Sequence, residues 1–101
     1  MHLVQILLPL VDNEGQALPA ELFRTVRGEL SARFGGLTAF TRAPAEGDWR
    51  VGDETCRDDI VVFEVMAEAI AREWWAEYRR KLEHAFRQHS IVVRAQPIEL
   101  L

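Results

Sequence analysis

The chain has 101 residues, of which 49% are hydrophobic and 28% are charged. A chain of this length is typical of one domain and buries about two-thirds of its unfolded surface, enough for a core without metal ions or disulfide bonds. Its 16 acidic and 12 basic side chains give a formal net charge of −4. This balance argues against binding to nucleic acid, because proteins that hold a phosphate backbone carry a basic surplus.

The cysteine content and the first residues bear on where the protein resides. Cys56 is the only cysteine, so an internal disulfide is excluded and nothing indicates an oxidising compartment. The apolar opening at residues 3–8 is short, has no basic stretch before it and is soon followed by Pro9. Such a segment is typical of neither a signal peptide nor a membrane span. We therefore expect a cytoplasmic protein without membrane contact, folded as a single domain over residues 1–101.

The first third of the chain predicts a strand followed by a helix. Residues 3–10 are almost continuously apolar, as in a central strand, and residues 12–15 have turn chemistry. Pro19 suits the first turn of a helix, and the glycine pair at 35–36 suits its left-handed end. Between these limits the apolar side chains recur at spacings of three and four and form one stripe, made of Leu22, Phe23, Val26, Leu30 and Phe34.

The rest of the chain predicts three further strands and a second helix. Residues 37–42 indicate a strand, and residues 43–58 then combine proline, glycine and five acidic side chains in a long connection. Residues 60–66 are the clearest strand, residues 67–88 the clearest helix, and residues 91–95 the last strand. The apolar stripe of this helix consists of Ile70, Trp74, Trp75, Tyr78, Leu82, Ala85 and Phe86.

This order of elements predicts the ferredoxin-like α+β fold, β-α-β-β-α-β. Two right-handed crossovers place the first and third strands in the centre of a four-stranded antiparallel sheet, with both helices on one face. Side chains alternate between the faces of a strand, so the pattern also predicts which ones meet the helices. These inward side chains are Val4, Ile6, Leu8, Val61, Phe63, Val65, Ile91, Val93 and Ala95.

The opposite face of the sheet is predicted to be apolar except for Gln5, Glu64 and Arg94. One interpretation is that this face packs on the same face of a second copy, with Glu64 and Arg94 as an interfacial pair that fixes the register. The other is that it walls a pocket whose polar groups hold a small ligand. We favour the dimer, because paired charges in the middle of a strand are more often structural than catalytic.

The long connection carries a second candidate site. Residues 48–51 indicate a short extra strand within it, and Trp49 lies near Arg42, Arg50 and Arg57. This group is interpreted either as a lid that offers an aromatic wall and cations to a carboxylate or phosphate, or as a pinned loop whose arginines pair with neighbouring acids. Acidic side chains outnumber basic ones there, which favours the second interpretation.

The remaining reactive side chains form no recognisable site. Cys56 stands next to Arg57, which favours a thiolate, but no histidine is near it in the sequence, so we expect an inert thiol. The spacing of His2, His84 and His89 does not match a metal-binding pattern. We therefore expect no metal ion and no cofactor, and the catalytic residues, if any exist, are unknown.

Two short segments carry a family resemblance. Arg33–Thr38 (RFGGLT) followed by Gly47–Arg50 (GDWR) is similar to a helix-end, strand and loop pattern in an uncharacterised bacterial family. By its element order the chain also resembles the ferredoxin-like proteins that form dimeric α+β barrels through their open sheet faces. That group includes monooxygenases of the antibiotic-biosynthesis type and muconolactone isomerase-like enzymes. The resemblance implies the fold and a homodimer, and it carries over no catalytic motif.

Three functions stay open from the sequence. The first is a homodimeric domain with a binding or accessory role. The second is a small cofactor-free isomerase or monooxygenase-like enzyme with a pocket between sheet and helices; its ligand-binding side chains would be Gln5, Arg42, Trp49, Glu64 and Arg94. The third is an interaction subunit whose apolar tail, residues 98–101, docks on another protein.

Overall fold

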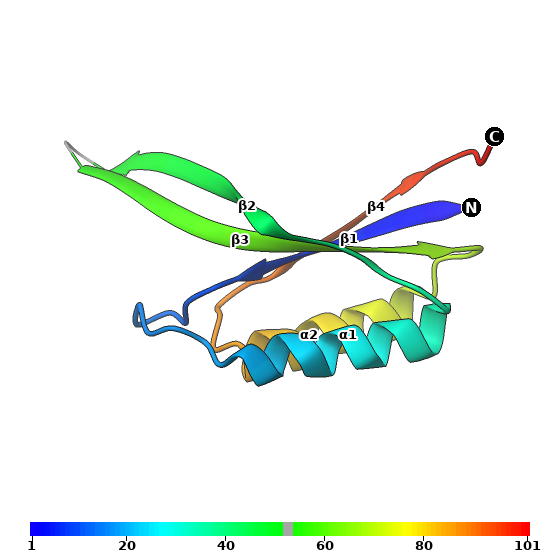
Figure 1. Ribbon diagram of the computed structural model, residues 1–101, viewed down its shortest axis with the longest axis horizontal. Helices are drawn as coiled ribbons and strands as arrows, with labels where there is room; N and C mark the ends of the chain where they lie inside the picture. Colours follow the sequence, from blue (N-terminus) through cyan, green and yellow to red (C-terminus); the bar gives the residue numbers. More distant parts are fainter. Residues whose placement is uncertain (52–53) are drawn as a thin grey trace.

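The described residues of the computed structural model form the predicted succession of elements (Figure 1). The structure describes the backbone of residues 1–51 and 54–101, and the side chains of residues 1–40 and 60–101. The elements are β1 (His2–Pro9), α1 (Ala20–Phe34), β2 (Thr38–Val51), β3 (Glu54–Ala67), α2 (Arg72–Ala85) and β4 (Val92–Pro97).

The four strands form one antiparallel sheet in the order β2-β3-β1-β4. The first and third strands are therefore central, as predicted. Both helices cover one face of the sheet, and neither of these described helices covers the opposite face (Figure 1). This arrangement confirms the ferredoxin-like fold.

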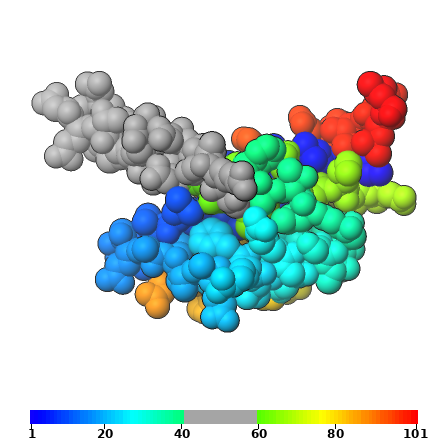
Figure 2. All heavy atoms as spheres, viewed as in Figure 1, coloured from blue at the N-terminus to red at the C-terminus, as the bar shows by residue number. Residues whose placement is uncertain are grey.

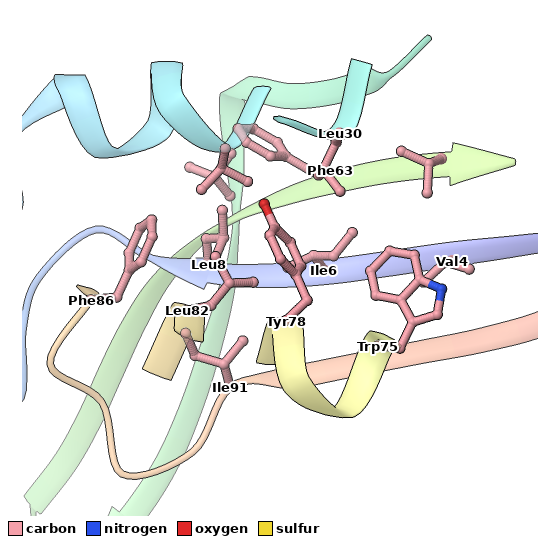
Figure 3. Close-up of a cluster of buried hydrophobic side chains, with 13 residues drawn as sticks. Val4, Ile6, Leu8, Leu30, Phe63, Trp75, Tyr78, Leu82, Phe86 and Ile91 are labelled. Atoms are coloured by element: carbon pink, nitrogen blue, oxygen red, sulfur yellow. The ribbon is translucent and has the colours of Figure 1, made fainter. Parts of the chain in front are cut away.

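The core lies between the sheet and the two helices (Figure 3). Val4, Ile6 and Leu8 of β1 point into it from the centre of the sheet, and Phe63 of β3 and Leu30 of α1 meet them. Each fully buried side chain of this size contributes about 1.5–3 kcal/mol relative to its exposed state. The alternation predicted for β1 and β3 is confirmed. On β4 it holds less well, since Val93 is only half-buried and Ala95 is exposed.

Aromatic side chains join the two helices. Trp75 is buried, whereas Trp74 is half-buried and stacks on Tyr78 with ring centroids 4.8 Å apart. The guanidinium carbon of Arg33, from α1, lies 4.1 Å from the centroid of the Trp74 ring. Burial raises the pKa of Tyr78, and the neighbouring carboxylate of Glu29 acts in the same direction. Trp75 therefore belongs to the core, and Trp74 packs against its edge.

The prediction of a long loop at residues 43–58 is wrong. Residues 43–51 belong to β2 and residues 54–58 to β3, the two strands pair antiparallel, and their register shifts between Phe40 and Ala45. Pro44 lies within this irregularity, where a residue without an N–H group is tolerated. The proline, glycine and acidic residues of this segment are uncommon in strands, so its sequence did not indicate strands. The candidate roles of Trp49 and Cys56 lie outside the described side chains.

The prediction that the second helix begins at Ala67 is also wrong. Ala67 still belongs to β3, where it pairs with His2, and α2 begins five residues later at Arg72. Pairing with β1 thus outweighs the intrinsic helix preference of this segment. Glu68 consequently precedes the helix, and Glu73 is the acidic residue of the first turn. Ala85, expected in the apolar stripe, is exposed.

The ion pairs of α2 comprise one pair within the helix and one with α1. Lys81 pairs with Glu29 of α1 rather than with a carboxylate of its own helix. Glu83 lies 3.5 Å from Arg79 and also accepts a 2.9 Å hydrogen bond from the backbone N–H of Ile91. The contacts with Glu29 and with Ile91 hold the helix to α1 and to the residue before β4, whereas the Arg79–Glu83 pair is local to the helix.

A buried carboxylate organises the turn between β1 and α1. Asp12 is only 6% exposed, and its Oδ1 accepts 2.9 Å hydrogen bonds from the N–H groups of Glu14 and Gln16. Its Oδ2 lies 3.7 Å from the guanidinium of Arg87, at the end of α2. The amide of Gln16 lowers the pKa of Asp12, the amide of Glu14 and the charge of Arg87 act in the same direction, and burial opposes them. The turn therefore depends on an ionised carboxylate.

Acidification should remove this contribution. Because the pKa of Asp12 is lower in the folded chain than in the unfolded chain, its stabilisation is present above the ordinary aspartate pKa and is lost as the pH falls through the folded value. We expect Asp12→Asn, which keeps an acceptor oxygen, to be less stable than wild type at pH 7 and to match it well below about pH 4. Asp12→Ala should be less stable than both at pH 7. Urea unfolding across this pH range measures the differences, and a pH-independent gap between wild type and Asp12→Asn would contradict the assignment.

Two glycines of α1 should respond to alanine in opposite ways. Gly28 lies inside the helix and Gly35 ends it at φ 77°, and an added Cβ at either position has nothing within 4 Å. Gly28→Ala should therefore stabilise the protein by about 0.5–1 kcal/mol, since only backbone entropy changes. Gly35→Ala should destabilise it by about 1–2 kcal/mol, because the left-handed conformation is unfavourable for an L side chain. Thermal unfolding of both variants tests the expectation, and equal signs would contradict it.

Candidate functional site

The open face of the sheet carries one row of polar side chains that crosses all four strands. Thr38 of β2 is opposite Glu64 of β3, Glu64 is opposite Gln5 of β1, and Gln5 is opposite Arg94 of β4. Directly paired residues point to the same face of a sheet. The four side chains, defined here as the polar row, therefore lie side by side.

Gln5 joins the two charges of the polar row. Its amide Nε2 donates a 2.9 Å hydrogen bond to Oε2 of Glu64, and its Oε1 accepts a 2.8 Å hydrogen bond from Nε of Arg94. The amide thus presents its donor to the anion and its acceptor to the cation, the orientation that satisfies both. The row behaves as one chain of charge-assisted bonds with a negative end over β3 and a positive end over β4.

An apolar row lies beside the polar row, two residues further along each strand. Register pairs Phe40 with Val62, Val62 with Leu7, and Leu7 with Val92. Phe40 is 49% exposed and Val92 is 50% exposed, although all four side chains of this row are apolar. On the other side of the polar row, Leu3 lies between Met66 and Gln96.

A cleft lies on the other side of the sheet, where the start of α2 leaves β1 and β4 uncovered. Its volume is about 410 Å³. The chain termini meet at this end of the molecule (blue and red in Figure 2), and the N–H of Ile98 donates to the carbonyl of Met1. Trp75 lies over Val4 and forms part of the wall (Figure 3). The complete lining is His2, Val4, Ile70, Arg72, Trp75, Val93, Arg94, Ala95 and Pro97.

The structure brings together three of the five predicted site residues. Gln5, Glu64 and Arg94 belong to the polar row on the open face, where Gln5 and Arg94 also border a hollow of about 220 Å³. Gln5 and Glu64 face away from the helices, and Glu64 also borders a hollow of about 250 Å³ with Phe34 and Gly35 at the end of α1. Arg42 and Trp49 lie outside the described side chains.

The sequence analysis did not predict that His2 and Arg72 lie together in the lining of one cleft. His2 was considered only as a metal ligand, although it shares the inward parity of Val4 on β1. The helix predicted over residues 67–88 includes Arg72 in its interior, whereas Arg72 is the first residue of α2. The alternation along β1 could have placed His2 on the helix side of the sheet. The position of Arg72, in contrast, depends on where β3 stops pairing with β1.

Within the described residues, no cluster of three or more histidine, cysteine or acidic side chains has an arrangement that could hold a metal ion. Neither of the described helices has the length and apolar composition needed to span a bilayer.

Comparison with known proteins supports the fold. No family model and no curated protein matches the sequence. Among solved structures, the divalent cation tolerance protein Cut A1 from Thermus thermophilus superposes with a TM-score of 0.60 at 15% identity, covering 97% of this chain and 84% of that one. A phage SAM lyase in complex with S-methyl-5'-thioadenosine gives a TM-score of 0.58 at 15% identity, covering 94% and 79%. At such identities the likeness establishes a shared fold and carries no activity.

Replacing the central amide should test the polar row. Gln5→Glu removes the donor to Glu64 and places a second carboxylate directly opposite it, while attraction to Arg94 offsets part of this effect, so we expect a net loss of about 0.2–1 kcal/mol at pH 7. The deficit should disappear in acid, where both carboxyls are protonated. Gln5→Leu, the uncharged control, should change stability by less than about 0.5 kcal/mol at either pH. Denaturant unfolding at both pH values measures this, and a deficit of Gln5→Glu that persists in acid would show that charge is not its cause.

Proposed function

We propose that this protein is a homodimeric domain with a binding role, in which two copies pack their open sheet faces against each other. The observation that supports this most is the polar row with the apolar row beside it. Glu64 and Arg94 lie on either side of Gln5. A second copy turned over about β1 would therefore place its Arg94 over Glu64 and its Glu64 over Arg94.

The open face has the exposure and size of an interface. Phe40, Met66 and Val92 are each about half exposed on it, at 49%, 50% and 50%. The part of the sheet built on the eight residues of β1 measures about 19 by 26 Å, or about 500 Å² in projection, from ordinary strand spacing and rise. Stable interfaces bury about 800 Å² of accessible surface per partner, and a corrugated face exceeds its projection. The face is therefore of the right order for one partner.

The charge pattern favours one orientation of the second copy. If the two-fold axis runs between the sheets and along β1, Glu64 of each copy faces Arg94 of the other, and Gln5 faces Gln5. The apolar rows then also meet, with Val62 over Val92 and Leu7 over Leu7. If the axis runs across the strands, Glu64 faces Glu64 and Arg94 faces Arg94, which is unfavourable by several kcal/mol in order of magnitude. We infer the axis along β1.

The two rows have different roles in this dimer. Burying apolar area contributes about 25 cal/mol per Å², so the apolar row would supply most of the affinity. The charged pairs must lose water on burial, and such pairs roughly break even with apolar contacts. Their role is then to exclude the wrong orientation and register. A catalytic role is less well supported, because Gln5 and Glu64 face away from the helices.

Charge exchange tests the dimer and its orientation together. Arg94→Glu or Glu64→Arg alone should weaken association at least tenfold, because each places like charges opposite one another in both symmetry-related pairs. The double variant with both changes should restore association, since the Gln5 amide can rotate to serve the reversed order. Sedimentation equilibrium on the full chain over micromolar concentrations measures the dissociation constants.

Two further variants complete the test. Leu7→Lys at the centre of the apolar row should give a monomer, whereas Ala32→Lys on the exposed side of α1 adds the same charge and should leave the dimer intact. A wild-type monomer or an assembly larger than a dimer would overturn the proposal. A dimer that tolerates Leu7→Lys would show that association uses another surface.

A further inference from the structure

The cleft beside α2 combines an apolar wall with cationic groups. Val4, Ile70, Trp75 and Val93 supply the wall, and the exposed methyl of Ala95 forms part of the lining. Among the titratable residues of the described lining, His2 and Arg72 have their side chains on this side of the sheet, whereas Arg94 borders the cleft but directs its guanidinium to Gln5 on the open face; none of the three is a carboxylate. The cleft therefore offers positive charge next to apolar surface.

A polar atom in this cleft is buried without a partner. Nδ1 of His2 is shielded from solvent, and no described group forms a hydrogen bond with it. Buried polar atoms in native proteins are nearly always satisfied, and an unsatisfied one is unfavourable by about 1–3 kcal/mol. An imidazole Nδ1–H is a suitable donor to an anionic oxygen. His2 is thus a residue of the cleft wall whose Nδ1 has no hydrogen-bond partner among the described groups.

The size and position of the cleft also suit a small ligand. Its volume of about 410 Å³ falls in the range typical of small-molecule sites, about 300–1,000 Å³. The amino-terminal end of α2 borders it through Arg72 and Trp75, and the partial positive charge of a helix start favours an anion. Ala71, the N-cap residue of α2, has no side-chain hydrogen bond to the first turn.

We propose that this cleft binds a small organic anion with an apolar body, of the arylalkyl carboxylate class. The carboxylate accepts hydrogen bonds from His2 and Arg72, and the apolar body lies against Ile70, Trp75 and Ala95. The site is on the helix side of the sheet, opposite the polar row, so it does not depend on the dimer.

Nuclear magnetic resonance titration of the ¹⁵N-labelled full chain with phenylacetate tests this site. Millimolar phenylacetate should shift the amide signals of His2, Arg72 and Ala95 and should saturate. Benzyl alcohol, which has the same ring without the charge, and acetate, which has the charge without the ring, should each bind at least tenfold more weakly, since one charge-assisted hydrogen bond or one buried ring contributes about that much.

Variants separate the two parts of the site. Arg72→Gln should weaken phenylacetate binding about tenfold or more, because a hydrogen bond to a charged group is lost. Ala95→Phe should fill the cleft and abolish binding while leaving the amide spectrum otherwise folded. Arg80→Gln, an exposed arginine on the same helix, is the matched control and should bind as wild type does.

Several outcomes would overturn the proposal. They are the absence of saturable shifts, equal binding of benzyl alcohol, shifts confined to the open face, or an equal loss in Arg72→Gln and Arg80→Gln. The titration is repeated with Leu7→Lys, which should still bind phenylacetate. Loss of binding in that variant would show that a single chain does not suffice as the site.

Discussion

The structure depends on the antiparallel pairing of β1 with β3 on one side and β4 on the other. This double pairing sets Gln5 opposite both Glu64 and Arg94, and it sets Leu7 opposite both Val62 and Val92. A shift of one residue in either register would move every side chain of that strand to the other face. The core, the polar row and the cleft therefore share one cause, although they lie on different sides of the sheet.

The same pairing explains which predictions succeeded. Alternation along β1 and β3 is a local property with a period of two, so Val4, Ile6 and Phe63 could be placed inward and Gln5 and Glu64 outward from the sequence alone. Boundaries were less predictable. Ala67 stays in β3 because His2 pairs with it across the sheet, and no local pattern records a contact between residues so far apart.

The cleft shows a second limit of sequence reasoning. Its lining comes from β1, from the start of α2 and from β4, and these residues converge only after the sheet has formed. His2 and Arg72 are not part of a recognisable sequence motif, and they are too far apart in the chain for a spacing pattern to connect them. What the sequence does contain is the alternation along β1. His2 is an even-numbered residue like Val4 and Ile6, so the alternation predicts that it faces the helices.

The two faces of β1 contribute to two different surfaces of this domain. Odd-numbered residues of β1 carry the pattern that supports self-association, and even-numbered residues run from the core at Ile6 to the cleft at His2. A substitution at an odd-numbered residue of β1 changes the open face, and one at an even-numbered residue changes the core or the cleft. In either case the backbone that supports the opposite face is unchanged. The proposed self-association and the proposed ligand site can therefore be tested separately by single changes on one strand. The fold achieves this because the helices shield one face of the sheet while α2 starts too late to shield its end.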